Sequence, residues 1–253
     1  MKGKLIFTVA LLCVTLYVPL SLYSQDFEID GTVLVRYNGK AANVTIPEGV
    51  TDIGRGAFSH CTSLTSVTIP SSVTYIAWAA FAECGSLTDV TISEGVTYIG
   101  NYAFNFCSSL TSVTIPSSVT IIREGAFADC SSLVSVTISE GVTYIGDYAF
   151  ARGKSLTSVT LPESITYIGD YAFHNCGSLT GVTIPSNVTT IGNGAFYGCS
   201  NRSFTSVTIP SSVTFVMDRA FYGCNNLRTV TVSRATRIGG SAFPAAARII
   251  YSD

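Results

Sequence analysis

The chain reads Ser63-Leu-Thr-Ser-Val-Thr-Ile-Pro-Ser-Ser-Val-Thr-Tyr-Ile-Ala-Trp-Ala-Ala-Phe-Ala-Glu-Cys-Gly85, and it then repeats this pattern of 23 residues. An Ala-Phe pair marks the period. The pairs lie 23 residues apart at 57/58, 80/81, 103/104, 126/127, 149/150, 172/173 and 195/196, and two more follow at 220/221 and 242/243. A fixed period of about 20 to 50 residues is typical of a solenoid, in which each repeat forms one coil and stacks on the next.

Each repeat carries the alternation of a short strand. Val67 and Ile69 point to one side, while Ser66 and Thr68 between them point to the other. The proline that follows ends the strand in many repeats, because proline cannot donate to a ladder. The Ala-Phe pair supplies a small residue and a large apolar plug on a tight turn or short helical segment. We therefore predict a β-rich α/β solenoid of about nine stacked repeats with a parallel sheet.

The bulk composition narrows the choice of class and partner. The chain has 253 residues, of which 47% are hydrophobic and 12% are charged, and its formal charge is -2. So many apolar residues with so little charge exclude a disordered chain. The charge balance is not basic, which argues against nucleic acid as a partner.

The two ends of the chain differ from the repeats. Residues 1–24 begin with Lys2 and Lys4 and continue as an apolar run, which predicts a secretory signal peptide; the alternative is an uncleaved membrane anchor. Residues 25–46 contain the turn signal Asp30-Gly31 and predict an N-terminal hairpin cap. The repeats then occupy residues 47–243, and residues 244–253 are expected to form a short C-terminal cap over the last coil.

The pattern L-x-x-V-x-I-P, followed by V-T-x-I-G-x-x-A-F-x-x-C, resembles the BspA-like class of leucine-rich repeats over about residues 45–243. The resemblance implies a right-handed leucine-rich repeat solenoid with a parallel sheet on its concave side. It also implies a secreted or surface-displayed protein of a bacterium or a parasitic protist. Members of this family are described as adhesins, so the resemblance implies an extracellular partner such as the host matrix proteins fibronectin and fibrinogen, or another cell surface.

A cysteine occupies one position of nearly every repeat. The seven are Cys61, Cys84, Cys107, Cys130, Cys176, Cys199 and Cys224. Adjacent coils would place their Cα atoms about 5 Å apart, which a disulfide accepts, but the side chains would run parallel and their number is odd. Converging metal ligands are not expected from residues lined up along a rod. The pattern favours a column of buried thiols beside the phenylalanines over disulfides or a metal site.

No catalytic constellation stands out in the sequence. The two histidines, His60 and His174, occupy different repeat positions five repeats apart, and neither has a carboxylate and a nucleophile at repeat spacing. A glycine-rich phosphate loop is also missing from the sequence. We therefore expect a protein that is not an enzyme and that uses no cofactor.

The first candidate binding surface is the outward side of the predicted strands, which is rich in hydroxyl groups. One explanation for these residues is that they have high β propensity and keep the surface soluble. The other is that they form a binding face for an extended protein or glycan. The candidate residues are Ser66, Thr68, Asp89, Thr91, Ser112, Thr114, Ser135, Thr137, Ser158 and Thr160.

The second candidate surface is an aromatic stripe. The rings could sheath the edge of the core, or they could serve as anchors for a partner, since exposed tyrosine and tryptophan are common hot-spot residues. The candidate residues are Tyr75, Trp78, Tyr98, Tyr102, Tyr144, Tyr148, Tyr167 and Tyr171.

Together these features predict a secreted or surface-displayed, non-catalytic repeat protein for adhesion or protein binding. Two alternatives stay open. One is a structural or periplasmic repeat protein without a host ligand, and the other is a carbohydrate-binding module that uses the tyrosines.

Overall fold

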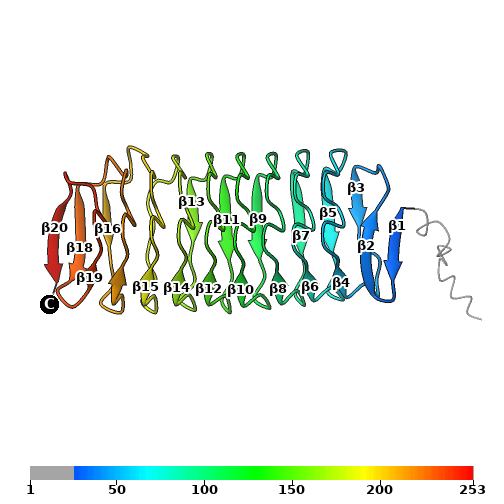
Figure 1. The fold of residues 1–253 in the computed structure, drawn as a ribbon, viewed down its shortest axis with the longest axis horizontal. Helices are drawn as coiled ribbons and strands as arrows, with labels where there is room; N and C mark the ends of the chain where they lie inside the picture. Colours follow the sequence, from blue (N-terminus) through cyan, green and yellow to red (C-terminus); the bar gives the residue numbers. More distant parts are fainter. Residues whose placement is uncertain (1–25, 253) are drawn as a thin grey trace, which may run out of the picture.

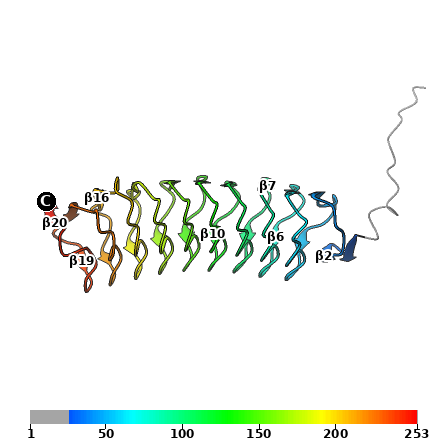
Figure 2. The same ribbon diagram turned by 90° about the horizontal axis from the view of Figure 1, so that it is seen from above.

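The computed structural model describes residues 26–252, which form a long rod of stacked coils (Figure 1). The axis of the stack is nearly straight in both views (Figures 1 and 2). The predicted signal peptide of residues 1–24 lies outside the described residues, as does Gln25 of the predicted cap.

One side of the rod, which we call the strand face, consists of the short parallel strands that the repeat predicts. Their register pairs equivalent residues of successive coils, so that Val67 lies beside Val90 and Thr68 beside Thr91. The strands group into three separate sheets, β3-β5-β7, β9-β11-β13 and β16-β18-β20. They are β3 (Asn43–Thr45), β5 (Ser66–Ile69), β7 (Asp89–Ile92), β9 (Ser112–Ile115), β11 (Ser135–Ile138), β13 (Ser158–Thr160), β16 (Ser206–Thr208), β18 (Thr229–Ser233) and β20 (Arg248–Ser252).

A second sheet runs along another side of the rod. It has eleven strands, most of them two residues long, and it is parallel except for the first pair. The sequence predicts only one parallel sheet, because a two-residue strand is too short to show an alternation. The strands are β1 (Phe27–Asp30), β2 (Val33–Tyr37), β4 (Asp52–Ile53), β6 (Tyr75–Ile76), β8 (Tyr98–Ile99), β10 (Ile121–Ile122), β12 (Tyr144–Ile145), β14 (Tyr167–Ile168), β15 (Thr190–Ile191), β17 (Phe215–Val216) and β19 (Arg237–Ile238).

The third side, which we call the turn edge, contains the Ala-Phe segments and the residues up to each cysteine. Within residues 26–252 these segments are turns, and no helix occurs. The turns bind to each other across coils: the Phe81 N–H donates to the Ala103 carbonyl at 2.7 Å, and the Phe104 N–H donates to Ala126 at 2.7 Å. Backbone hydrogen bonds thus connect successive coils along the turn edge as they do within the sheets.

The core is a set of parallel columns inside the coils. The Ala-Phe phenylalanines stack ring on ring from Phe58 to Phe243, with centroids 4.7 to 5.5 Å apart. Leu64, Val73 and Ile76, with their copies, fill the space between the phenylalanines and the two sheets. The predicted division into inward Val and Ile and outward Ser and Thr is confirmed by the burial along β5 and β9.

The two ends of the stack are covered to different extents. The antiparallel hairpin of β1 and β2 joins the second sheet, and the ring of Tyr37 continues the phenylalanine column at 5.0 Å from Phe58. At the other end β20 pairs in parallel with β18. The hairpin covers the core at the first coil, whereas β20 extends only the strand face at the other end and leaves Ile238 of β19 38% exposed.

Candidate functional site

The ten candidate residues of the strand face lie outward along the rod. The threonines of successive strands stand in one row, as Thr114, Thr137 and Thr160 do across β9, β11 and β13. All three are exposed. The strand face therefore presents hydroxyl groups at the spacing of the coils, with few charges among them.

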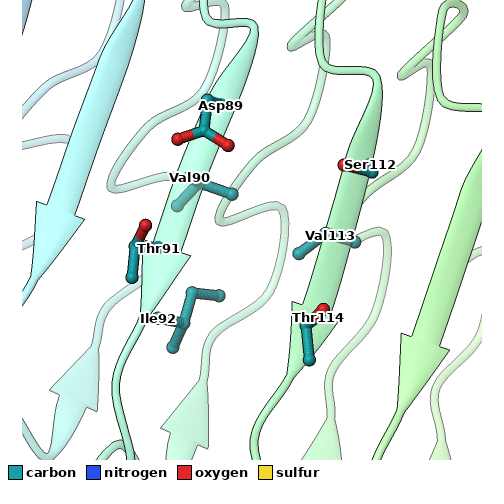
Figure 3. A pocket seen from close by; sticks show the side chains of 7 residues that line it. All are labelled: Asp89, Val90, Thr91, Ile92, Ser112, Val113 and Thr114. Carbon is teal, nitrogen blue, oxygen red and sulfur yellow. The ribbon is translucent and has the colours of Figure 1, made fainter.

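A slot interrupts the strand face between β7 and β9 (Figure 3). Its volume is about 260 Å³, and Asp89 and Thr91 line one side while Ser112 and Thr114 line the other. These two strands belong to successive coils but share no ladder. The backbone bond just before them, from the Thr111 N–H to the Thr88 carbonyl, is long at 3.4 Å.

The slot also uncovers part of the core. Val90 and Ile92 of β7 are 7% and 8% exposed, whereas Val67 is 1% exposed and Ile69 is fully buried. The slot thus combines an apolar floor, polar walls and two strand edges whose N–H and C=O groups have no ladder partner across it. Backbone groups in that state favour a hydrogen-bonding partner.

Sequence reasoning named the four polar residues of the slot but not the slot itself. The one local signal is Asp89, which stands where most repeats have serine and which has low β propensity. A similar exception, Gly181, occurs where the strand face lacks a strand between β13 and β16. Asn43 and Thr229 also replace serine at this position but lie within intact ladders, so a departure from the consensus does not by itself mark a break.

The predicted aromatic stripe is divided between two sides of the rod. Tyr75, Tyr98, Tyr144 and Tyr167 lie on the second sheet in stacked pairs, Tyr75–Tyr98 at 4.5 Å and Tyr144–Tyr167 at 4.9 Å. Burial raises the pKa of Tyr144 and of Tyr167, so these rings are partly embedded and sheath the sheet.

The remaining members of the stripe lie on the turn edge or beside it. Tyr102, Tyr148 and Tyr171 are in the turns, and Tyr148 stacks on Tyr171 at 5.1 Å. Tyr102 donates its hydroxyl to Glu124, and this bond raises the pKa of Tyr102 to about 12. Trp78 is exposed, with the guanidinium of Arg55 4.2 Å from its ring centre.

Three aromatic residues of the turn edge, Phe106, Tyr197 and Tyr222, were not predicted as site residues because they fall outside the consensus positions of the repeat, and His174 was considered only for catalysis. Phe106 and Tyr222 are exposed, and His174 and Tyr197 are half-buried. They lie next to the recurring Ala-Phe and Cys positions, whose regular pattern predicts the core. Only a comparison of the variable positions across repeats could have grouped them.

The column of buried thiols is confirmed. The seven cysteines of the repeats are all free, and Cys61 alone among them is half-buried rather than buried. Each buried thiol points to a phenylalanine carbonyl of the preceding coil, as the Cys84 Sγ does to Phe58 at 3.0 Å. Burial raises the pKa of Cys84, Cys130 and Cys176 to about 12, so these thiols are chemically quiet.

One histidine gains a carboxylate that the sequence did not suggest. The His60 Nδ1 lies 3.1 Å from a carboxylate oxygen of Glu83 in the next coil, and both side chains are exposed. The neighbouring Cys61 does not complete a nucleophilic pair, because burial raises the pKa of its thiol instead of lowering it. Among residues 26–252 no three His, Cys, Asp or Glu side chains gather as metal ligands would.

Stacked coils with parallel strands, an apolar column and one Leu-x-x-Val-x-Ile segment per turn define a leucine-rich repeat solenoid. The chain belongs to the family described as the BspA type leucine rich repeat region, whose sequence profile matches residues 35–154 and 122–250 in six copies. No match was found among curated proteins. A helix long and apolar enough to cross a membrane does not occur in the described part of the chain.

Two solved structures share the fold over most of this chain. A leucine-rich cell surface protein from Faecalibacterium prausnitzii is 32% identical, with a TM-score of 0.66, over 89% of this chain and 74% of that protein. A leucine-rich repeat protein from Bacteroides ovatus is 30% identical, with a TM-score of 0.68, over 89% of this chain and 71% of that protein. The expected family and fold are thereby confirmed.

Proposed function

We propose that this chain is an exported, non-catalytic adhesive protein that binds an extracellular protein through its strand face, with the slot between β7 and β9 at the centre of the contact. Host matrix proteins and the surfaces of other cells are the partners we expect. The slot is the observation that carries the proposal, because polar side chains, slightly uncovered apolar groups and strand edges without a ladder partner meet there in one hollow.

The rest of the strand face supports the same use. Its threonine row continues on both sides of the slot, so a partner seated there can make further weak contacts along the rod. Contacts that are individually weak add up when they are held on one rigid surface. Charged residues are few on this face, so little desolvation of charge opposes the contact.

The proposal of export has its own support. The first 24 residues have the pattern of a signal peptide, and one structural relative is described as a cell surface protein. Antibody against the chain should label intact cells of the source organism or detect the chain in the culture medium, and added protease should remove the label. Detection only after the cells are lysed would contradict export.

Binding can be tested with the purified chain on immobilised fibronectin, fibrinogen and whole cells. The double variant Thr91→Arg/Thr114→Arg fills the slot with two bulky charges and should lower binding at least tenfold. The control Tyr98→Ala/Tyr167→Ala alters the second sheet and should change binding less than twofold. If the wild-type chain binds none of these surfaces, or if both variants bind like the wild type, the adhesive role of the strand face is wrong.

A further inference from the structure

A second concave surface lies on the turn edge, on another side of the rod from the strand face. It is a groove of about 390 Å³, within the usual range of small-molecule sites of about 300 to 1,000 Å³. Three aromatic rings line it, those of Tyr102, Phe106 and Tyr148, and the methyl groups of Ala128 and Ala151 lie between them. The alanines are almost fully buried, so they form a low floor below the rings.

The polar groups of the groove are arranged in pairs. The Arg152 guanidinium donates to both carboxylate oxygens of Asp129, at 3.0 and 3.3 Å, and the Asn105 amide donates to the Ala128 carbonyl at 3.0 Å. Half of the Arg152 side chain is still exposed, so it keeps N–H groups that can donate to a ligand. The carboxylate and the guanidinium cancel in charge, which leaves a groove that is polar and neutral.

All three rings occupy backbone positions that disfavour them, and Tyr102 has a φ value of 58°. Tyr148 and Phe106 have φ values of 57°, in the left-handed region where glycine is the usual residue. Later coils have glycine at these positions, Gly194 for Tyr148 and Gly198 for Phe106. The left-handed conformation belongs to the repeat, since Ala79, Glu83 and Asp129 adopt it at the equivalent positions of other coils. The exposure of Tyr148 (37%) and Phe106 (48%) nevertheless leaves these two rings outside the core and open to a ligand.

Ring contacts connect this groove to a second one farther along the same edge. Tyr148 stacks on Tyr171, Tyr171 meets His174 edge-on at 5.6 Å, His174 contacts Tyr197 at 5.2 Å, and Tyr197 stacks on Tyr222 at 5.4 Å. The second groove has a volume of about 620 Å³, and its lining includes these last two tyrosines and only uncharged residues. At about 4.8 Å per coil, the two grooves lie roughly 17 Å apart.

We infer that the turn edge binds a neutral glycan, a chain of uncharged hexoses that lies across the two grooves along the row of rings. A pyranose ring has an apolar C–H face that packs on an aromatic ring, and its hydroxyl groups both donate and accept hydrogen bonds. In the first groove Asp129 supplies hydrogen-bond acceptors and Arg152 supplies donors. In the second groove the side-chain amide of Asn175 supplies donors. Because the carboxylate of Asp129 neutralises the guanidinium of Arg152, the groove exerts no net attraction on the negative charge of an acidic sugar. A neutral sugar carries no charge and does not depend on such an attraction.

The test is a calorimetric titration of the full chain with hexasaccharides of glucose, mannose or galactose. At least one of these neutral oligomers should bind the wild-type chain, and Tyr148→Ala should weaken that binding tenfold or more. Tyr148→Phe keeps the ring and should bind within threefold of the wild type. Tyr75→Ala is the matched control, because Tyr75 is also a stacked tyrosine of similar exposure (38%) but lies on the second sheet; it should change binding less than twofold.

Three results would overturn the inference: no binding of any neutral hexasaccharide at millimolar concentration, equal loss from Tyr148→Ala and Tyr75→Ala, or binding of a hexauronate alone. Raising the salt concentration should leave the affinity unchanged, because the ligand carries no charge; a steep loss would count against it. The glycan site shares no residue with the slot of the strand face. Loss of glycan binding in Tyr148→Ala with unchanged protein binding therefore tests this inference separately from the adhesive role.

Discussion

The cysteine column illustrates how a single residue type serves the stack. Each thiol is small enough to sit beside a phenylalanine ring and can still donate to a carbonyl of the coil before it, as the Cys107 Sγ does to Phe81 at 3.3 Å. The thiol therefore fills space without leaving a buried polar atom unpaired.

The burial of these thiols predicts their reactivity. In a chain carrying Cys13→Ser, a thiol reagent at pH 8 should modify Cys61 alone while the protein is folded, because the other six thiols are buried. Burial also raises the pKa of Cys84, Cys130 and Cys176 to about 12. All seven should react in denaturant. Fewer than five free thiols in denaturant would contradict the thiol column, as would rapid modification of several thiols in the folded state.

Backbone conformation sets a second constraint at this scale. Gly194 has a φ of 55°, and a Cβ built on it would lie 2.5 Å from the ring of Tyr171. Gly194→Ala should therefore destabilise the fold by about 1 to 2 kcal/mol, from the left-handed conformation and the displaced ring together. Gly177 has open space around it, so Gly177→Ala should be close to neutral in urea unfolding. Equal stability of the two variants would argue against the backbone conformation described here.

Glutamates connect neighbouring coils by accepting hydrogen bonds from the backbone of the following coil, and we call such a glutamate a clamp. Glu94 accepts hydrogen bonds from the backbone N–H groups of Ser117 and Ser118, at 3.1 and 3.0 Å, in the turn of the following coil. Glu140 does the same for Glu163 and Ser164, two coils farther on. Glu163 in turn accepts a hydrogen bond from the Ser186 N–H of the next coil at 2.9 Å, so consecutive coils can each carry a clamp.

The hydrogen bonds of Glu94 predict how its contribution to the stability of the fold depends on pH. The Ser117 N–H and its neighbours hold the pKa of Glu94 below its ordinary value of 4.5. A carboxylate whose pKa is lowered by folding stabilises the protein above its ordinary pKa, and this contribution is lost as the pH falls through the folded value. Glu94→Gln should therefore lower the unfolding temperature at pH 7 by more than at pH 3.

Glu48 is the control for this prediction. It stands at the same repeat position, it is exposed, and none of the hydrogen bonds found for side chains of residues 26–252 involves it. Glu48→Gln should leave the unfolding temperature unchanged at both pH values. An equal effect of both substitutions would show that general charge, and not the clamp, is responsible.

The elements also show how far the sequence could lead. The strands of the strand face, their inward Val and Ile, and the hairpin cap were all predictable, because alternation and turn signals are local properties. The slot was not, since it depends on how β7 and β9 sit in adjacent coils whose sequences are nearly the same. The sequence also predicts a single stripe that contains both Tyr98 and Tyr102. In the structure the chain bends between them, so the two rings lie on different sides of the rod.

At the scale of the whole molecule, the stack is a one-dimensional array. Each coil contacts its neighbours, so stability should follow the number of coils and the quality of the contacts between them. The two-residue insertion Asn201-Arg202 fits this description. It lengthens one coil, yet the phenylalanine column continues from Phe196 to Phe221 at 5.0 Å.

A deletion tests this modular character. Removing residues 93–138 takes out two coils, joins Ile92 to Ser139, and keeps the 23-residue register. This variant should fold, with a urea m-value lower by roughly one fifth because less surface is buried. Removing residues 93–126 breaks the register and should prevent cooperative folding. Equal behaviour of the two deletions would contradict a stack built from whole coils.

The most direct test of recognition through the strand face is to label a cysteine in the slot, since the buried native thiols should not react with the label. In a chain with Cys13→Ser and Cys61→Ser, a new cysteine at Ser112 in the slot can be labelled with a bulky maleimide, and one at the exposed Thr143 beside the second sheet serves as the control. Binding of each labelled chain to the matrix protein or cell that the wild type binds best is then measured. We predict at least a tenfold loss for the label at residue 112 and less than a twofold change for the label at residue 143. Full binding with the label in the slot would contradict recognition through the strand face.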